Sequence, residues 1–94
     1  MNSKSIYKIP NGKLLKISLE YDENKNTVSN VKITGDFFAY PEESIETLED
    51  ELKNMQLKKE VLLKKINSII KTNNITFIGV NAEGLTEGLL RCLQ

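Results

Sequence analysis

The alternation of apolar and polar positions predicts a three-stranded antiparallel meander, with strands at about 5–10, 13–21 and 28–35. Asn11-Gly12 stands between the first two strands, and this dipeptide favours a hairpin because both residues tolerate a positive φ. The second strand places four apolar residues on one face, namely Leu15, Ile17, Leu19 and Tyr21. In the third strand the corresponding residues are Ser29, Val31 and Ile33. Polar residues occupy the other face, so one side of the sheet is expected to meet solvent.

After residue 40 the apolar spacing changes to that of helices. Pro41 is expected at the first helical position, followed by acidic residues in the first turn of a helix over about 42–53. Its buried stripe is predicted to hold Ile45, Leu48 and Leu52. Its solvated face is predicted to hold six acids: Glu42, Glu43, Glu46, Glu49, Asp50 and Glu51.

A second helix is predicted over about 57–72, with Leu62, Ile66, Ile69 and Ile70 inward and lysines outward. Residues 75–80 are expected to form a short β-like or extended segment. Asn81 is suited to cap a last helix over about 82–93. Gly84 and Gly88 would each weaken that helix by roughly 1 kcal/mol, so its stability should depend on docking.

These elements predict a single α+β domain over residues 1–94, with the meander in 5–35 and the helical part in 42–93. Three helices are expected to cover one face of the sheet. The chain is 39% hydrophobic and 28% charged, which is within the range of globular domains. A chain of 94 residues leaves little room for a deep, walled pocket.

Charge and residue usage narrow the function further. Thirteen basic residues balance thirteen acidic ones, which weakens the case for a nucleic-acid or membrane-surface binder. The chain has no histidine and one cysteine, Cys92, so the usual zinc sites and the Ser-His-Asp and Cys-His nucleophile systems are excluded. No signal peptide or membrane span is visible, so a cytoplasmic location is expected. We expect no metal ligand and no catalytic residue in this chain.

The segment between sheet and first helix holds most of the residues with unusual surroundings. Asp36 stands between Gly35 and two phenylalanines, where it is either an acid/base candidate or an Asx turn or cap. Phe37 and Phe38 are adjacent, so at most one can join the core under the helices, and the other, with Tyr40, is either exposed or covered by a partner. The alternative is that local helix packing covers both rings.

Two lysines and the cysteine leave further alternatives open. Lys13 and Lys16 are either solvated strand lysines or cations that meet a phosphate or carboxylate. Cys92 fits a half-buried structural residue better than a nucleophile. The candidates for a partner interface or an active-site cover are therefore Lys13, Lys16, Gly35, Asp36, Phe37, Phe38 and Tyr40.

Three segments carry a resemblance to a known family: residues 11–17 (NGKLLKI), 31–38 (VKITGDFF) and 41–49 (PEESIETLE). Together they resemble the small C-terminal accessory domain of lipoate–protein ligases, which in some archaea is a separate subunit. The resemblance implies a non-catalytic accessory subunit, required with a separate catalytic subunit that binds lipoate and ATP with Mg²⁺ and forms lipoyl-AMP. That subunit would then pass the lipoyl group to carrier domains of 2-oxoacid dehydrogenases or to the glycine cleavage H protein.

A second resemblance supplies an alternative. The meander with a Gly-led loop that enters a helix is similar to iron–sulfur cluster scaffold proteins, which place a cysteine after that glycine. Here Asp36 follows Gly35, and cluster ligation requires several thiolates. The alternative reading is thus a scaffold-like fold, or another protein-interaction module, without a ligase role. A nucleic-acid module that uses Phe37 and Phe38 lacks the positive field such binding requires.

Overall fold

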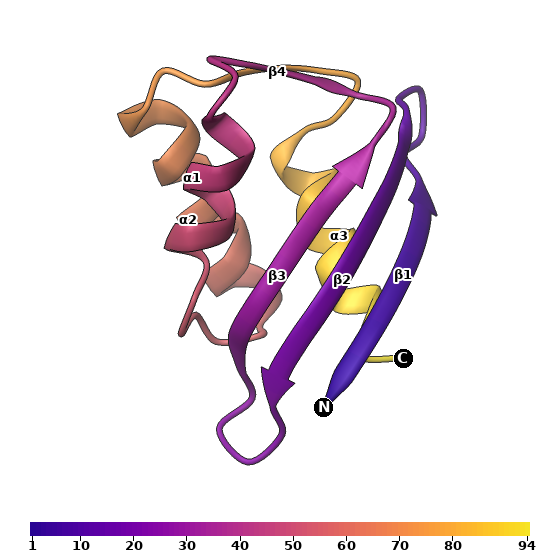
Figure 1. Cartoon of the computed structure of the whole chain (residues 1–94), viewed down its shortest axis with the longest axis vertical. Helices are drawn as coiled ribbons and strands as arrows, with labels where there is room; N and C mark the ends of the chain where they lie inside the picture. Colours follow the sequence, from indigo (N-terminus) through magenta and orange to yellow (C-terminus); the bar gives the residue numbers. More distant parts are fainter.

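The predicted meander is present in the computed structural model, which describes residues 1–94. Strands β1 (Asn2–Lys8), β2 (Leu14–Asp22) and β3 (Thr27–Gly35) form one antiparallel sheet in chain order. The helices are α1 (Ser44–Glu51), α2 (Lys59–Thr72) and α3 (Ala82–Arg91). Two further strands, β4 (Phe38–Tyr40) and β5 (Thr76–Ile78), pair with each other to form a small second sheet. Figure 1 places this second sheet across one end of the molecule.

The β1–β2 connection is a hairpin, but it is not the Asn-Gly turn that the sequence favoured. The Gly12 N–H donates to the Ile9 carbonyl oxygen at 2.8 Å, which makes Pro10 and Asn11 the central residues of the turn. Asn11 has a φ of 59°. A proline followed by a residue with positive φ is the pattern of a type II turn. Proline favours this placement because its ring fixes φ at the first central position.

The register of β2 and β3 shifts by one residue between Glu20 and Tyr21. Glu20 pairs with Asn30 and Tyr21 pairs with Val28, so Ser29 is the extra residue of a bulge. Val28 is therefore buried together with Val31 and Ile33, whereas Ser29 is exposed. The prediction that Ser29 shares the inner face was wrong, because a one-residue shift moves the following side chains to the opposite face.

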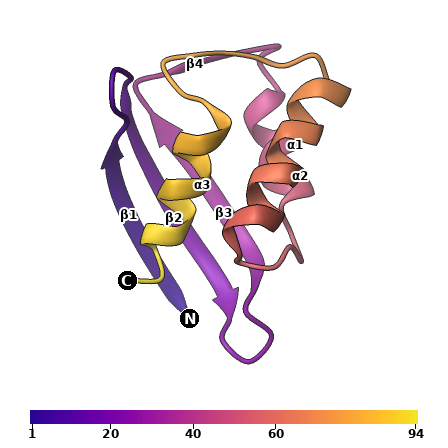
Figure 2. The ribbon, with the colours of Figure 1, turned by 180° about the vertical axis from the view of Figure 1, so that it is seen from behind.

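The helices cover the sheet in two ways. Helix α3 lies across the inner face of β1 and β2, and α2 packs against α3 on the same side (Figure 2). Helix α1 contacts β3 and lies along its free edge, where the Glu49 carboxylate accepts a hydrogen bond from the Ile33 N–H at 2.8 Å. The expectation that all three helices cover one face is thus corrected for α1, which covers the free edge of β3 while its Leu48 side chain enters the core.

Two details of α1 differ from the prediction. The helix begins at Ser44, with Glu43 at the N-cap, and Pro41 lies in the preceding turn, whose carbonyl accepts from the Ser44 N–H. Pro41 is displaced from the helix because residues 38–40 are held in β4 and a turn must follow that strand. Glu49 is only 9% exposed, so it does not belong to the solvated acidic face.

The core lies between the inner sheet face and the helices, and the predicted apolar stripes supply most of it. Leu48, Leu52, Leu62, Ile66, Leu85 and Leu89 are all fully buried. Asn81 caps α3 as predicted, because its side-chain oxygen accepts from the Gly84 N–H at 2.7 Å. A Cβ at Gly88 would lie 2.9 Å from side-chain carbons of Leu15 and Ile17. The glycine that weakens the helix therefore lets α3 approach β2 closely.

Candidate functional site

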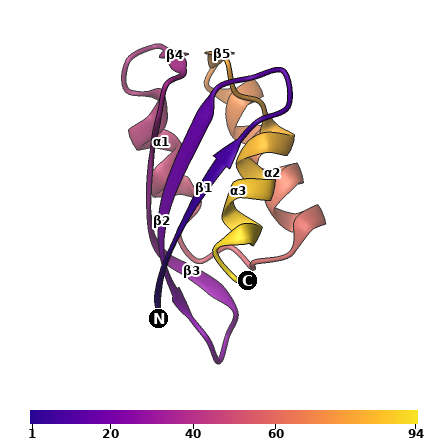
Figure 3. The ribbon, with the colours of Figure 1, turned by 90° about the vertical axis from the view of Figure 1, so that its right-hand side faces the viewer.

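The most distinctive surface of the molecule is the outward face of the small β4–β5 sheet. Phe38 pairs with Ile78 and Tyr40 pairs with Thr76, so these four side chains share one face. Phe38 is 63% exposed, Tyr40 54% and Ile78 52%, which are among the highest values of any large apolar side chains in the protein. Phe38, Tyr40 and Ile78 are called the apolar patch below. Figure 3 shows β4 and β5 side by side at the end of the molecule that carries it.

The opposite face of this small sheet is turned toward the core. The Phe37 ring meets the Phe77 ring edge to face, with centroids 6.4 Å apart, and both rings are half-buried. The two adjacent phenylalanines thus lie in different environments, which confirms the prediction that at most one of them joins the core. The β-like segment expected at residues 75–80 is present as β5, but its pairing with β4, and hence the place of Ile78 in the patch, was missed.

Backbone hydrogen bonds join this end of the molecule to the main sheet. The Lys13 N–H donates to the Gly79 carbonyl oxygen at 2.9 Å, and the Asp36 N–H donates to the Leu14 carbonyl oxygen at 3.1 Å. Gly79 has a φ of 91°, and a Cβ there would lie 2.5 Å from Lys13 Cγ. A Cβ on Gly35 would overlap the Leu14 carbonyl oxygen. Both positions favour glycine because each backbone has a positive φ and approaches another segment closely: Gly35 lies against the neighbouring strand β2, and Gly79 lies against the residue before β2.

Six of the seven candidate residues lie at this end of the molecule: Lys13, Gly35, Asp36, Phe37, Phe38 and Tyr40. Lys16 does not, because its side chain lies on the outer face of the main sheet, in one cross-strand row with Ile6 and Thr34. The Asp36 side chain is exposed and makes no hydrogen bond, so the alternative of an Asx turn or cap at this residue was wrong. Asp36 has the surroundings of an ordinary surface carboxylate rather than of a general acid.

A small hollow of about 180 Å³ lies beside this end, between the β1–β2 loop and residues 79–81. Sites for small molecules usually enclose about 300–1,000 Å³. The hollow is therefore too small for a nucleotide, whereas the exposed apolar patch beside it has the character of a protein contact.

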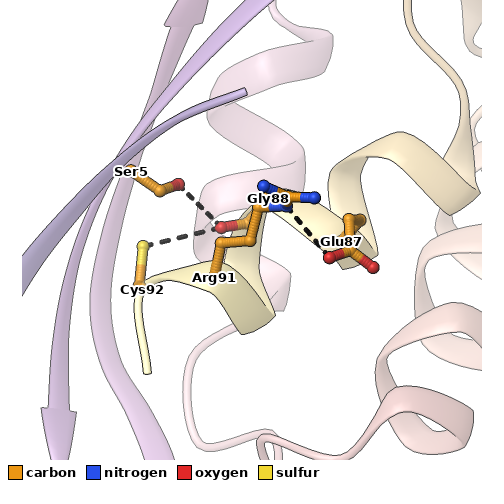
Figure 4. Close-up of polar contacts among 5 residues, drawn as sticks. All are labelled: Ser5, Glu87, Gly88, Arg91 and Cys92. Atoms are coloured by element: carbon orange, nitrogen blue, oxygen red, sulfur yellow. Dashed lines mark hydrogen bonds and ion pairs between the residues drawn. The ribbon is translucent and has the colours of Figure 1, made fainter. Parts of the chain in front are cut away.

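Cys92 is a structural residue. It is 2% exposed, and its thiol points toward the Gly88 carbonyl oxygen at 3.6 Å, which also accepts from the Ser5 hydroxyl at 2.7 Å (Figure 4). Burial raises the pKa of the Cys92 thiol, and the hydrogen bond with Ser5 opposes that rise in part. A buried, protonated thiol is a poor nucleophile and a poor metal ligand.

No three side chains of the types Cys, Asp and Glu lie close enough to hold a metal ion. None of the helices has the length and apolar character needed to cross a membrane.

Comparison with known proteins shows the family to which the chain belongs. A family model described as the C-terminus of bacterial lipoate protein ligase matches residues 7–89. The chain belongs to this family. It is 33% identical over 79 residues to "Lipoate-protein ligase A subunit 2" of Thermoplasma acidophilum, a match that covers 81% of this chain and 76% of that protein.

A solved structure agrees with the family assignment. It describes an archaeal lipoylation system, a bi-partite lipoate protein ligase and its E2 lipoyl domain from Thermoplasma acidophilum. The likeness has a TM-score of 0.72 at 27% identity and covers 95% of this chain and 92% of that one. The α+β fold, with its three-stranded sheet and three helices, is thus that of a lipoate–protein ligase C-terminal domain. The predicted family and the predicted antiparallel meander are both confirmed.

Proposed function

We propose that this chain is the accessory subunit of a two-part lipoate–protein ligase. Its partner is a separate catalytic subunit that binds lipoate and ATP with Mg²⁺ and forms lipoyl-AMP. One observation carries the proposal: the chain matches one part of a bi-partite ligase over nearly the whole length of both chains, and the related sequence is named as a second subunit.

The chemistry of adenylation explains what such a subunit contributes. A carboxylate must attack the α-phosphate of ATP, so two anions must be held in line while water is excluded. The only thiol of this chain is buried, and histidine is absent from its sequence. The accessory subunit therefore acts by covering the catalytic subunit's active site and ordering its loops, rather than by donating a proton or a nucleophile.

We propose that the apolar patch is the surface that binds the catalytic subunit. Long-lived interfaces are centred on apolar and aromatic side chains, and Phe38 and Tyr40 supply two exposed rings. Lys13 is exposed and its backbone is bonded to Gly79, the residue after β5. Contact through the patch would bring the Lys13 ammonium to the partner's surface, where it can meet the anionic acyl-phosphate region.

The product of the complex passes to a lysine on a lipoyl carrier domain of a 2-oxoacid dehydrogenase or on the glycine cleavage H protein. We place this reaction in the cytoplasm, with neither nucleic acid nor membrane as a partner. The alternative of an iron–sulfur scaffold requires several accessible thiolates, and the buried Cys92 does not meet that need. Reconstitution with iron and sulfide under anaerobic conditions separates the two proposals.

The two half-reactions of the ligase test the proposal. The catalytic subunit is assayed for lipoyl-AMP formation, and separately for transfer from synthetic lipoyl-AMP to a saturating carrier domain, each with and without this chain. We expect adenylation to require the chain. Transfer at saturating acceptor should proceed without it, because the mixed anhydride is already activated. If omission abolishes transfer and spares adenylation, the proposed role is wrong.

A further inference from the structure

A second surface is formed by the outer face of the main sheet, which is turned toward the viewer in Figure 1. The register places Lys4, Ser18 and Lys32 in one cross-strand row, and Ile6, Lys16 and Thr34 in the adjacent row. Lys4, Lys16 and Lys32 are all exposed, and they are called the lysine face below. With strands about 4.8 Å apart and about 3.4 Å per residue along them, these three lysines form a triangle with sides of roughly 8–10 Å.

None of the three lysines of the lysine face forms an ion pair within the protein. The three ion pairs of the molecule lie in the helical part of the chain: Lys53 with Asp50, Lys65 with Glu51 and Arg91 with Glu87. A third row, next to that of Lys4 and Lys32, consists of Asn2, Glu20 and Asn30. Glu20 is the one acidic side chain in these three rows, and it forms no ion pair. A chain with zero net charge thus concentrates cations on one face of its sheet.

The lysine face also has a shape that suits a convex partner. An open hollow of about 500 Å³ lies over the sheet, and Lys4, Ser18, Glu20 and Lys32 are among the residues that line it. Of the nine residues that line it, only Leu19 and Val31 are hydrophobic. Ile6, which is 69% exposed on the edge strand beside Lys16, supplies one apolar contact at the margin.

We propose that the lysine face captures the lipoyl acceptor domain by binding a carboxylate-rich surface on it; this rests on the proposed function. The catalytic subunit and the acceptor make different demands on an interface. A permanent partner is held by apolar burial, which the patch at the β4–β5 end provides. An acceptor must arrive and leave in every turnover, which suits a charged surface that speeds encounter without adding much buried apolar area.

A protein surface fits the lysine face better than a nucleic acid does. Base stacking requires exposed aromatic rings, and none of the side chains in the three rows of this face is aromatic. The Glu20 carboxylate would also repel a phosphate backbone. A protein partner, in contrast, can present a hydrogen-bond donor to this carboxylate.

The test uses the complex of this chain with its catalytic subunit and the acceptor domain from the same organism. In the double variant Lys4→Glu/Lys32→Glu, we expect the KM for the acceptor in the transfer step to rise about tenfold, the scale of lost electrostatic steering. The wild-type KM should also rise with ionic strength, because the lysines are exposed. The matched control is Lys64→Glu/Lys71→Glu, which reverses two exposed lysines on α2 and should leave that KM unchanged.

Three results with protein partners would overturn the proposal, and a fourth would come from a nucleic acid. They are an unchanged KM in the sheet variant, an equal rise in the α2 control, or a weaker affinity for the catalytic subunit, which would make the lysine face part of that interface. Competition by a single-stranded oligonucleotide with the same salt dependence would assign the face to nucleic acid instead. If the wild-type chain fails to support adenylation, the proposed function is at fault. In that case, the isolated chain can be titrated with the acceptor domain, and NMR chemical-shift changes recorded at low and high salt test whether the lysine face binds the acceptor.

Discussion

Phe37 and Phe38 are neighbours in sequence and differ in environment, so substitutions at the two positions should separate folding from binding. Phe38 is 63% exposed in the apolar patch, whereas Phe37 contacts Phe77. We expect Phe38→Ala to weaken the complex with the catalytic subunit by about 2 kcal/mol, as for an interface hot spot, and to leave the free energy of unfolding nearly unchanged. Phe37→Ala should instead destabilise the isolated chain by roughly 2 kcal/mol.

Calorimetric titration measures the first effect and urea unfolding the second. An unchanged affinity in Phe38→Ala, together with an unchanged affinity in Tyr40→Ala, would move the interface away from the patch.

The buried thiol of Cys92 makes stability depend on alkaline pH. Burial raises its pKa above the ordinary value of 9.0, so the contribution of the neutral thiol is fully present below pH 9.0. It is lost as pH rises from there through the raised folded value, because the unfolded chain releases this proton first. We expect the stability of the wild type, measured by urea unfolding, to fall more steeply above pH 9 than that of Cys92→Ala. A constant difference between the two proteins across this range would contradict the prediction.

At the scale of elements, the free edge of β3 is covered by the chain that follows it. The Val28 N–H donates to the Met55 carbonyl oxygen at 2.9 Å, and the Ile33 N–H donates to the Glu49 carboxylate at 2.8 Å. An uncovered edge strand would present these donors to other chains. The α1 helix and the loop after it therefore complete the sheet as well as the core.

Removal of the Glu49 carboxylate should show how much the covering of the β3 edge contributes to the free energy of unfolding. Glu49→Ala leaves the buried Ile33 N–H without a partner, which should lower the free energy of unfolding by about 1–3 kcal/mol. Glu49→Gln keeps an acceptor oxygen and should be milder. Urea unfolding of both variants, with the exposed Glu46→Ala of the same helix as control, checks the prediction. Equal losses in Glu49→Ala and Glu46→Ala would show that the hydrogen bond contributes nothing.

The elements predicted well from sequence are those whose signal is local. Period-two alternation predicted β2, and the capping residue Asn81 predicted the start of α3. Both patterns involve residues only a few positions apart. The pairing of β4 with β5 joins three-residue segments that lie far apart in the chain, and no local pattern marks it. The bulge at Ser29 and the burial of Glu49 were missed for the same reason, since each depends on a partner strand or helix.

At the scale of the whole molecule, two surfaces of different chemistry lie on different parts of the sheet framework. The apolar patch is at the β4–β5 end, and the lysine face lies over the outer side of β1–β3. The sequence analysis grouped Lys13 with Lys16, which the fold separates. Strand pairing and register determine which lysines lie together, because the face on which a side chain lies follows from its position along the strand.

The separation of these two lysines leads to a prediction about which half-reaction each one affects. Lys13 lies at the β4–β5 end, where its backbone bonds to Gly79, so contact with the catalytic subunit would bring its ammonium group near the reacting phosphate. We expect Lys13→Ala to slow lipoyl-AMP formation by about 10²-fold, the scale of a lost electrostatic contact in a site shielded from water. Lys16→Ala should act on the KM for the acceptor domain instead.

Lys25→Ala is the matched control, because Lys25 is equally exposed but lies in the β2–β3 turn at the far end of the sheet. Pre-steady-state formation of lipoyl-AMP, measured with the assembled complex at saturating ATP and lipoate, distinguishes the lysines. Adenylation within a few-fold of wild type in Lys13→Ala would mean that the subunit acts only by closing over the active site. Equal slowing in Lys13→Ala and Lys25→Ala would trace the effect to the subunit's overall charge rather than to the position of one ammonium group.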